Sequence, residues 1–99
     1  MTPADTLRAA RALIEQPERW TTTYLARNKQ GRITGHASED AVCWCAIGAI
    51  YKVTTDDPSP YLDVLRRITG NDLSGFNDSR THAEVLDAFD RAIEIAEGE

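Results

Sequence analysis

The sequence predicts a mainly α-helical fold: a single domain over residues 1–99, with about four helices around a buried central helix over residues 38–54. Two observations predict it. Apolar residues recur at intervals of three and four near both ends of the chain, as amphipathic helices require. Residues 41–50 hold no charged side chain, which is typical of a helix enclosed by its neighbours.

The first predicted helix begins at Thr2, an N-cap residue followed by Pro3, and ends before Pro17. Proline is favoured at the first helical position, whereas the residue before a proline avoids helical geometry. This segment carries four charged side chains, so it does not resemble a signal peptide. We therefore expect a cytoplasmic protein.

Residues 19–34 leave two alternatives open. The β-branched and aromatic residues 21–24 favour a strand, residues 28–31 resemble a turn that closes on glycine, and residues 32–34 would return as a second strand. The result would be a small β-hairpin between the first two helices. Trp20 and Tyr24 would pack it, because an isolated ribbon is only marginally stable. The alternative is a short helix over residues 20–28.

Ser38 is the expected N-cap of the central helix. Gly48 costs about 1 kcal/mol relative to alanine inside a helix, so it predicts that a neighbouring backbone or ring approaches closely there. Cys43 and Cys45 would point in different directions on a helix and could not form a disulfide. Two free thiols fit a reducing compartment.

The last half of the chain predicts two more helices. One follows Ser59 and Pro60 and ends at Thr69, and residues 71–80, rich in Asn, Asp, Ser and Gly, are expected to form a loop. The final helix starts at a capping box formed by Thr81 and Glu84.

Charge narrows the choice of partners. The net charge of −5 makes nucleic acid an unlikely partner, because an acidic surface repels phosphates. Ten uncharged residues span only about half of a bilayer, so no membrane association is expected. No cofactor or metal is expected either, because a C-x-C spacing on a helix separates its sulfurs. A protein partner or self-association remains.

The expected partner-binding residues form a short basic and aromatic arm. Aromatic rings between arginines can engage an acidic peptide, or the acidic final helix of a second copy. The members of this arm are Arg19, Tyr24, Arg27, Lys29 and Arg32.

Two further sets of residues have side chains that could form catalytic or ligand sites. Asn77 and Asp78 form a candidate loop site, although such side chains usually bond local backbone N–H groups. A small cysteine-dependent enzyme would use Cys45 with His82 and Asn77. A reactive thiolate needs a lowered pKa, which the apolar interior of a helix does not provide.

Residues 43–50 read CWCAIGAI and resemble the W-C-A-(I/L/V)-G-A-(L/I) segment of a small uncharacterised bacterial and phage family. The resemblance covers most of the chain and includes a tryptophan segment that ends at a Gly turn, here Trp20 and Gly31. It also includes an Asn-Asp pair before the last helix, here Asn77 and Asp78. Cys43 departs from the pattern. The resemblance implies no activity, since that family has no established function.

By elimination, the sequence predicts a small cytoplasmic, non-catalytic interaction protein. A phage-type inhibitor of a host factor is one concrete form of this hypothesis. The competing hypothesis is the cysteine-dependent enzyme.

Overall fold

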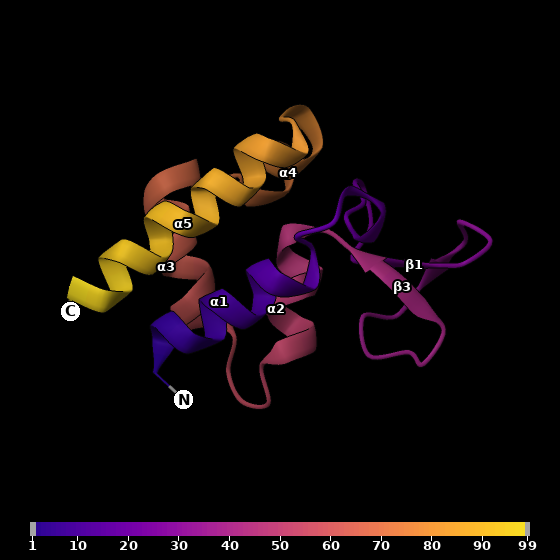
Figure 1. Ribbon diagram of the computed structural model, residues 1–99, viewed down its shortest axis with the longest axis horizontal. Helices are drawn as coiled ribbons and strands as arrows, with labels where there is room; N and C mark the ends of the chain where they lie inside the picture. Colours follow the sequence, from indigo (N-terminus) through magenta and orange to yellow (C-terminus); the bar gives the residue numbers. More distant parts are fainter. Residues whose placement is uncertain (1, 99) are drawn as a thin grey trace.

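The computed structural model describes residues 2–98, where a body of α-helices carries a small β-sheet at one end (Figure 1). The helices are α1 (Pro3–Leu13), α2 (Ala46–Val53), α3 (Ser59–Thr69), α4 (Leu73–Ser79) and α5 (His82–Gly98). The strands are β1 (Ala26–Asn28), β2 (Ile33–Thr34) and β3 (Ala41–Trp44), and a 3-10 turn, Pro17–Arg19, follows α1. The mainly helical prediction is confirmed, although the described residues form five α-helices rather than four.

The helical body is built from the amphipathic segments that the sequence indicates. α1 packs against α5 and α2, and α3 packs against α5. Leu7, Ile50 and Phe89 come from three of these helices, and each side chain is fully buried. Burial of such side chains stabilises the fold by about 2 kcal/mol each. In Figure 1, the C-terminal end of α5 lies at the end of this body that is opposite to the sheet.

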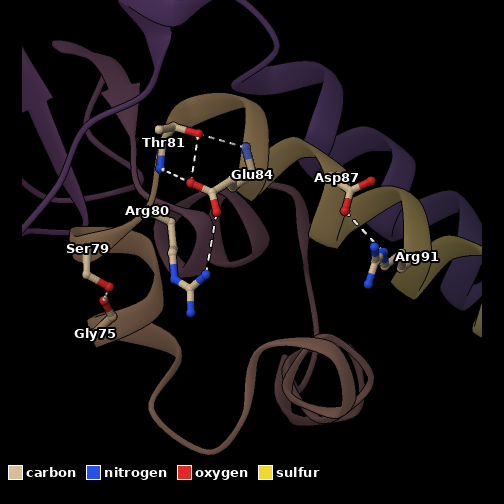
Figure 2. Close-up of polar contacts among 7 residues, drawn as sticks. All are labelled: Gly75, Ser79, Arg80, Thr81, Glu84, Asp87 and Arg91. Atoms are coloured by element: carbon tan, nitrogen blue, oxygen red, sulfur yellow. Dashed lines mark hydrogen bonds and ion pairs between the residues drawn. The ribbon is translucent and has the colours of Figure 1, made fainter.

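The capping box predicted before α5 is present (Figure 2). The Thr81 hydroxyl accepts a hydrogen bond from the Glu84 N–H at 3.2 Å, and the Glu84 carboxylate accepts one from the Thr81 N–H at 3.1 Å. Arg80 also pairs with Glu84 at 3.4 Å. The backbone N–H and the hydroxyl of Thr81 lower the pKa of Glu84.

Thr81→Ala should lower the free energy of unfolding by about 1 kcal/mol, because it leaves an N–H at the helix start without its acceptor. Glu84 has a lowered pKa in the fold, so its contribution is present above the ordinary glutamate pKa and is lost as pH falls through the lowered value. Urea titrations at neutral and acidic pH would measure both effects. Thr55→Ala, in an exposed loop, is the control, and equal losses in the two variants would contradict the capping role.

The predicted central helix over residues 38–54 is wrong in its first half. β3 occupies Ala41–Trp44, and α2 begins only at Ala46. A buried strand and a buried helix both give an uncharged run, so periodicity does not separate them. Pairing with a distant strand decides between them: Ala26 of β1 lies opposite Trp44. The Ser38 hydroxyl accepts a hydrogen bond from the Asp40 N–H in a turn and caps no helix.

The sheet has the order β2-β1-β3, and both strand pairs are antiparallel. A hairpin therefore forms where one was predicted, and the alternative helix over residues 20–28 is wrong. The first strand of the hairpin begins at Ala26, whereas the sequence predicted a start at Thr21. The predicted turn is present: the Gly31 N–H donates to the Asn28 carbonyl at 2.9 Å, and Gly31 has a φ of +80°, which glycine adopts readily.

Part of the predicted loop over residues 71–80 is helix α4. Asp72 is its N-cap, and its carboxylate accepts a hydrogen bond from the Gly75 N–H at 3.0 Å. Leu73 is buried in the core. Turn-type residues can therefore begin a short helix when one of them caps it and an apolar neighbour reaches the core. Asn77 and Asp78 consequently lie on a helix and not on a loop.

Candidate functional site

The two faces of the sheet have different surroundings. Ala26 and Trp44 lie opposite each other on one face and are 0% and 3% exposed, so this inner face belongs to the core. Arg27 lies opposite both Ile33 and Cys43, so these three side chains share the other face. We call the face of Arg27, Ile33 and Cys43 the outer face.

The exposed large hydrophobic side chains of residues 2–98 all belong to the sheet or its flanks. They are Tyr24, Ile33 and Val42, which are 45%, 55% and 41% exposed. Val42 lies at an irregularity of the β1–β3 register, where β3 has one residue more than β1. The expectation that residues 41–50 are sealed from water is therefore wrong at Val42. Clustered exposed apolar groups often mark an interaction site.

Most of the predicted arm lies in the same region, and Arg27 lies next to two of these apolar side chains: it contacts Tyr24 and is opposite Ile33. The Arg27 guanidinium lies over the Tyr24 ring at 5.3 Å, and it donates hydrogen bonds to Thr21 and to the Gly31 carbonyl. Lys29 and Arg32 are exposed on the turn between β1 and β2. We call the following set the sheet patch: Tyr24, Arg27, Lys29, Arg32, Ile33 and Val42.

Arg19 is not part of the sheet patch. Its guanidinium lies over the ring of Trp44, 5.8 Å from the centroid, and Trp44 belongs to the inner face. The sequence missed Ile33 and Val42 as surface residues of interest. Ile33 lies in a predicted strand, and Val42 falls within the buried helix predicted over residues 38–54. Their exposure depends on how their strands pair with β1, the strand of Arg27, and the sequence alone does not give this pairing.

The charge of this region differs from that of the rest of the chain. Residues 19–38 contain four of the eleven Lys and Arg and none of the sixteen Asp and Glu. The protein therefore carries a positive segment on an otherwise strongly negative chain. Such asymmetry steers a partner of opposite charge toward the positive part.

Asn77 connects the sheet to the helical body. Its side chain is 1% exposed, and its Oδ1 accepts hydrogen bonds from Trp20 Nε1 at 2.9 Å and from the Ala46 N–H at 3.0 Å. Its Nδ2 donates to the Thr21 carbonyl at 3.1 Å. One amide thus joins α4, the segment before β1 and the start of α2, and its groups are not free to bind a ligand.

Asp78 has a similar role at the surface. Its Oδ1 accepts a hydrogen bond from the Thr23 N–H at 2.8 Å and another from Asn77 Nδ2 at 3.2 Å. Thr23 has a φ of +78°, a strained conformation for a β-branched residue. The carboxylate thus helps to hold this strained segment. Asn77 and Asp78 thus bond to backbone groups of this chain, but these groups are distant in sequence and not local as predicted.

Cys45 lies at a helix N-terminus and not inside a helix as the sequence predicted. It is the N-cap of α2, and its sulfur accepts a hydrogen bond from the Gly48 N–H at 3.3 Å. Burial nevertheless raises the pKa of its thiol, and Asp78 contributes in the same direction. A cavity of about 170 Å³ lies between Cys45 and Asp78. Cys45 and Asp78 line the same cavity, and the negative charge of Asp78 disfavours the thiolate.

Both imidazoles have other contacts. His82 Nε2 lies 2.7 Å from the Ile14 carbonyl oxygen, and its ring packs on Trp20. The His36 ring meets Tyr51 edge to face at 5.3 Å. Within residues 2–98, neither imidazole forms a hydrogen bond with Cys43 or Cys45. The predicted grouping of Cys45 with His82 and Asn77 is thus not arranged as a nucleophile and its base.

Cys45 should react slowly with a thiol reagent at neutral pH, because it is 6% exposed and its thiol pKa is raised. Cys43 is partly exposed, so it should react faster. Mass spectrometry of the single variants Cys43→Ser and Cys45→Ser would separate the two rates. Faster labelling of Cys45 than of Cys43 would contradict this assignment.

Two kinds of feature are absent from residues 2–98. No group of three or more His, Cys, Asp or Glu side chains in this part of the chain could hold a metal ion. No helix there is both long enough and apolar enough to cross a bilayer.

A family model described as a family of unknown function (DUF6197) matches residues 1–95. No curated protein and no solved structure matches the chain.

Proposed function

Because the chain belongs to DUF6197, a family of unknown function, we propose a function from its own surface: a small, non-catalytic protein that binds a protein partner through the sheet patch. The helical body holds the sheet, and the sheet presents the binding groups. This proposal places the protein in the cytoplasm, with inhibition of a host factor as one form of its action.

One observation carries the proposal. The exposed large hydrophobic side chains of residues 2–98 all lie in the small sheet or directly before it, in the region of the chain that also carries Arg27, Lys29 and Arg32. Aromatic and arginine side chains are enriched at protein interfaces and contribute most of their binding energy. Leaving three large apolar side chains in water in and beside one small sheet offers no gain in folding, so a partner that covers them explains their exposure.

The contacts support this function over a cysteine-dependent enzyme. Cys45 is buried beside Asp78, and Asn77 uses both of its polar atoms to join chain segments. The His82 ring packs at a tilt against Trp20, and within residues 2–98 it forms no hydrogen bond with either sulfur. An enzyme of this type would require all three groups to rearrange.

A pull-down from the source-cell lysate tests the proposal. Immobilised wild-type protein should retain a partner at low and moderate salt, and the double variant Ile33→Asp, Val42→Asp should lose it. Both side chains are exposed, so the variant should fold. Ala83→Asp adds a carboxylate to the exposed first turn of α5 and is the control. Equal retention by the wild type and the double variant would contradict binding through the sheet patch.

A further inference from the structure

We infer that the partner of the sheet patch is an extended, acidic segment of another protein that also carries apolar side chains. This inference rests on the proposed function and adds the chemistry of the partner. It follows from three observations: the charges of the turn, the ion pairs of α5 and the position of β2 at the edge of the sheet.

Lys29 and Arg32 are the cations of the sheet patch that an acidic partner would bind. Both are exposed on the turn between β1 and β2, and their side chains form no ion pair or hydrogen bond within residues 2–98. Arg27, by contrast, is held by Thr21, the Gly31 carbonyl and the Tyr24 ring. Carboxylates of a partner would therefore meet Lys29 and Arg32 first, and Arg27 would fix the shape of the surface between them.

The acidic helix α5 of a second copy fits this role less well. Four of its carboxylates already have cations of their own chain. Arg8 pairs with Glu97 at 2.6 Å and Arg11 pairs with Asp90 at 2.7 Å. The other two pairs, Arg80 with Glu84 and Arg91 with Asp87, are drawn in Figure 2. A second copy would have to exchange existing pairs for new ones, with little net gain at an exposed surface.

The edge of the sheet favours an extended partner. β2 is an edge strand in the order β2-β1-β3, so its outer side has no strand beside it within residues 2–98. Ile33, the most exposed large apolar side chain described, lies on this strand. A peptide added beside β2 would place alternate side chains over Ile33 and the outer face, with the turn cations within reach. A segment that carries both acidic and apolar residues matches this surface.

A random 12-residue peptide library displayed on phage provides the test. Panning against the wild-type protein at low salt should enrich sequences that combine net negative charge with aliphatic or aromatic residues. Enriched peptides, made synthetically with a fluorophore, should bind Lys29→Glu and Arg32→Glu at least about tenfold more weakly than the wild type, because each variant reverses a charge at the interface. Lys52→Glu, an exposed charge reversal on α2, should bind as the wild type does.

Several outcomes would overturn the inference. Enrichment of neutral or basic peptides, no enrichment, or equal binding by all three variants would each reject an acidic segment. A 12-nucleotide single strand that binds the patch more tightly than any peptide would make nucleic acid the occupant. Dimers in sedimentation that dissociate in Lys29→Glu would make a second copy the occupant.

The two proposals can fail separately. If the lysate partner depends on Ile33 and Val42 but acidic peptides do not bind, only the acidic chemistry is wrong. If no partner depends on those two residues, the proposed function itself fails.

Discussion

Gly48→Leu is expected to unfold the protein. A Cβ atom at Gly48 would lie 2.0 Å from the Leu25 carbonyl oxygen and 2.8 Å from its carbon, and these are backbone atoms that cannot move aside as a flexible side chain does. The same carbonyl accepts a hydrogen bond from the Cys45 N–H at 3.1 Å. A side chain here would therefore force the segment before β1 away from α2. Overpacking alone costs about 1–3 kcal/mol or more, and a domain of this size has about 5–15 kcal/mol in total.

Far-UV circular dichroism with urea titration measures this loss. Gly48→Ala should already lower the free energy of unfolding by about 3 kcal/mol, because its single methyl group meets the same carbonyl. Gly35→Ala is the matched control, since a Cβ there has no heavy atom within 4 Å. A Gly48→Leu variant with a cooperative transition near that of the wild type would show that this close approach does not constrain the fold.

Asn77→Ala should be the second most damaging change, at about 3–5 kcal/mol. It removes the acceptor of Trp20 Nε1 and the Ala46 N–H, and the donor to the Thr21 carbonyl, at a position that is 1% exposed. Each buried polar group left without a partner costs about 1–3 kcal/mol. The sheet should loosen from the helical body as these bonds disappear.

Asn77→Asp tests the acceptor and the donor of the side-chain amide separately. It keeps an acceptor for Trp20 and Ala46, but replaces the donor by an oxygen that faces the Thr21 carbonyl and the Asp78 carboxylate. It should therefore also destabilise the protein at neutral pH. Urea titrations of both variants, with exposed Asn71→Ala as the control, measure the differences. A loss for Asn77→Ala no larger than that of the control would contradict its connecting role.

Features that depend on neighbouring residues were predictable from the sequence. Thr2 with Pro3 marked the start of α1, and Thr81 with Glu84 marked the start of α5, because a capping box lies within four residues. The close approach predicted at Gly48 is confirmed by its position against Leu25.

Features that depend on distant partners were not predictable. β3 forms because β1 lies beside it, and no local pattern distinguishes its uncharged run from a helix. The role of Asn77 depends on Trp20 and Ala46, which are 57 and 31 residues away along the chain. Val42 was assigned to the core for the same reason.

The candidate site was predicted in part. Tyr24, Arg27, Lys29 and Arg32 do gather around one sheet, as the basic and aromatic arm suggested, whereas Arg19 packs on Trp44. The aliphatic members of the patch, Ile33 and Val42, emerged only from the fold. Composition therefore indicated the charge of the surface, and the fold supplied its shape.

Photo-crosslinking from single positions tests the central claim most directly. A benzoyl-phenylalanine at Ile33, on the exposed sheet, is expected to form one discrete crosslinked species in the source cells, and the same group at Glu94 is expected to form none. Glu94 is exposed on α5, and Figure 1 places the C-terminal end of that helix far from the sheet. Crosslinks from Glu94 without any from Ile33 would place the partner on the helical body and contradict the account.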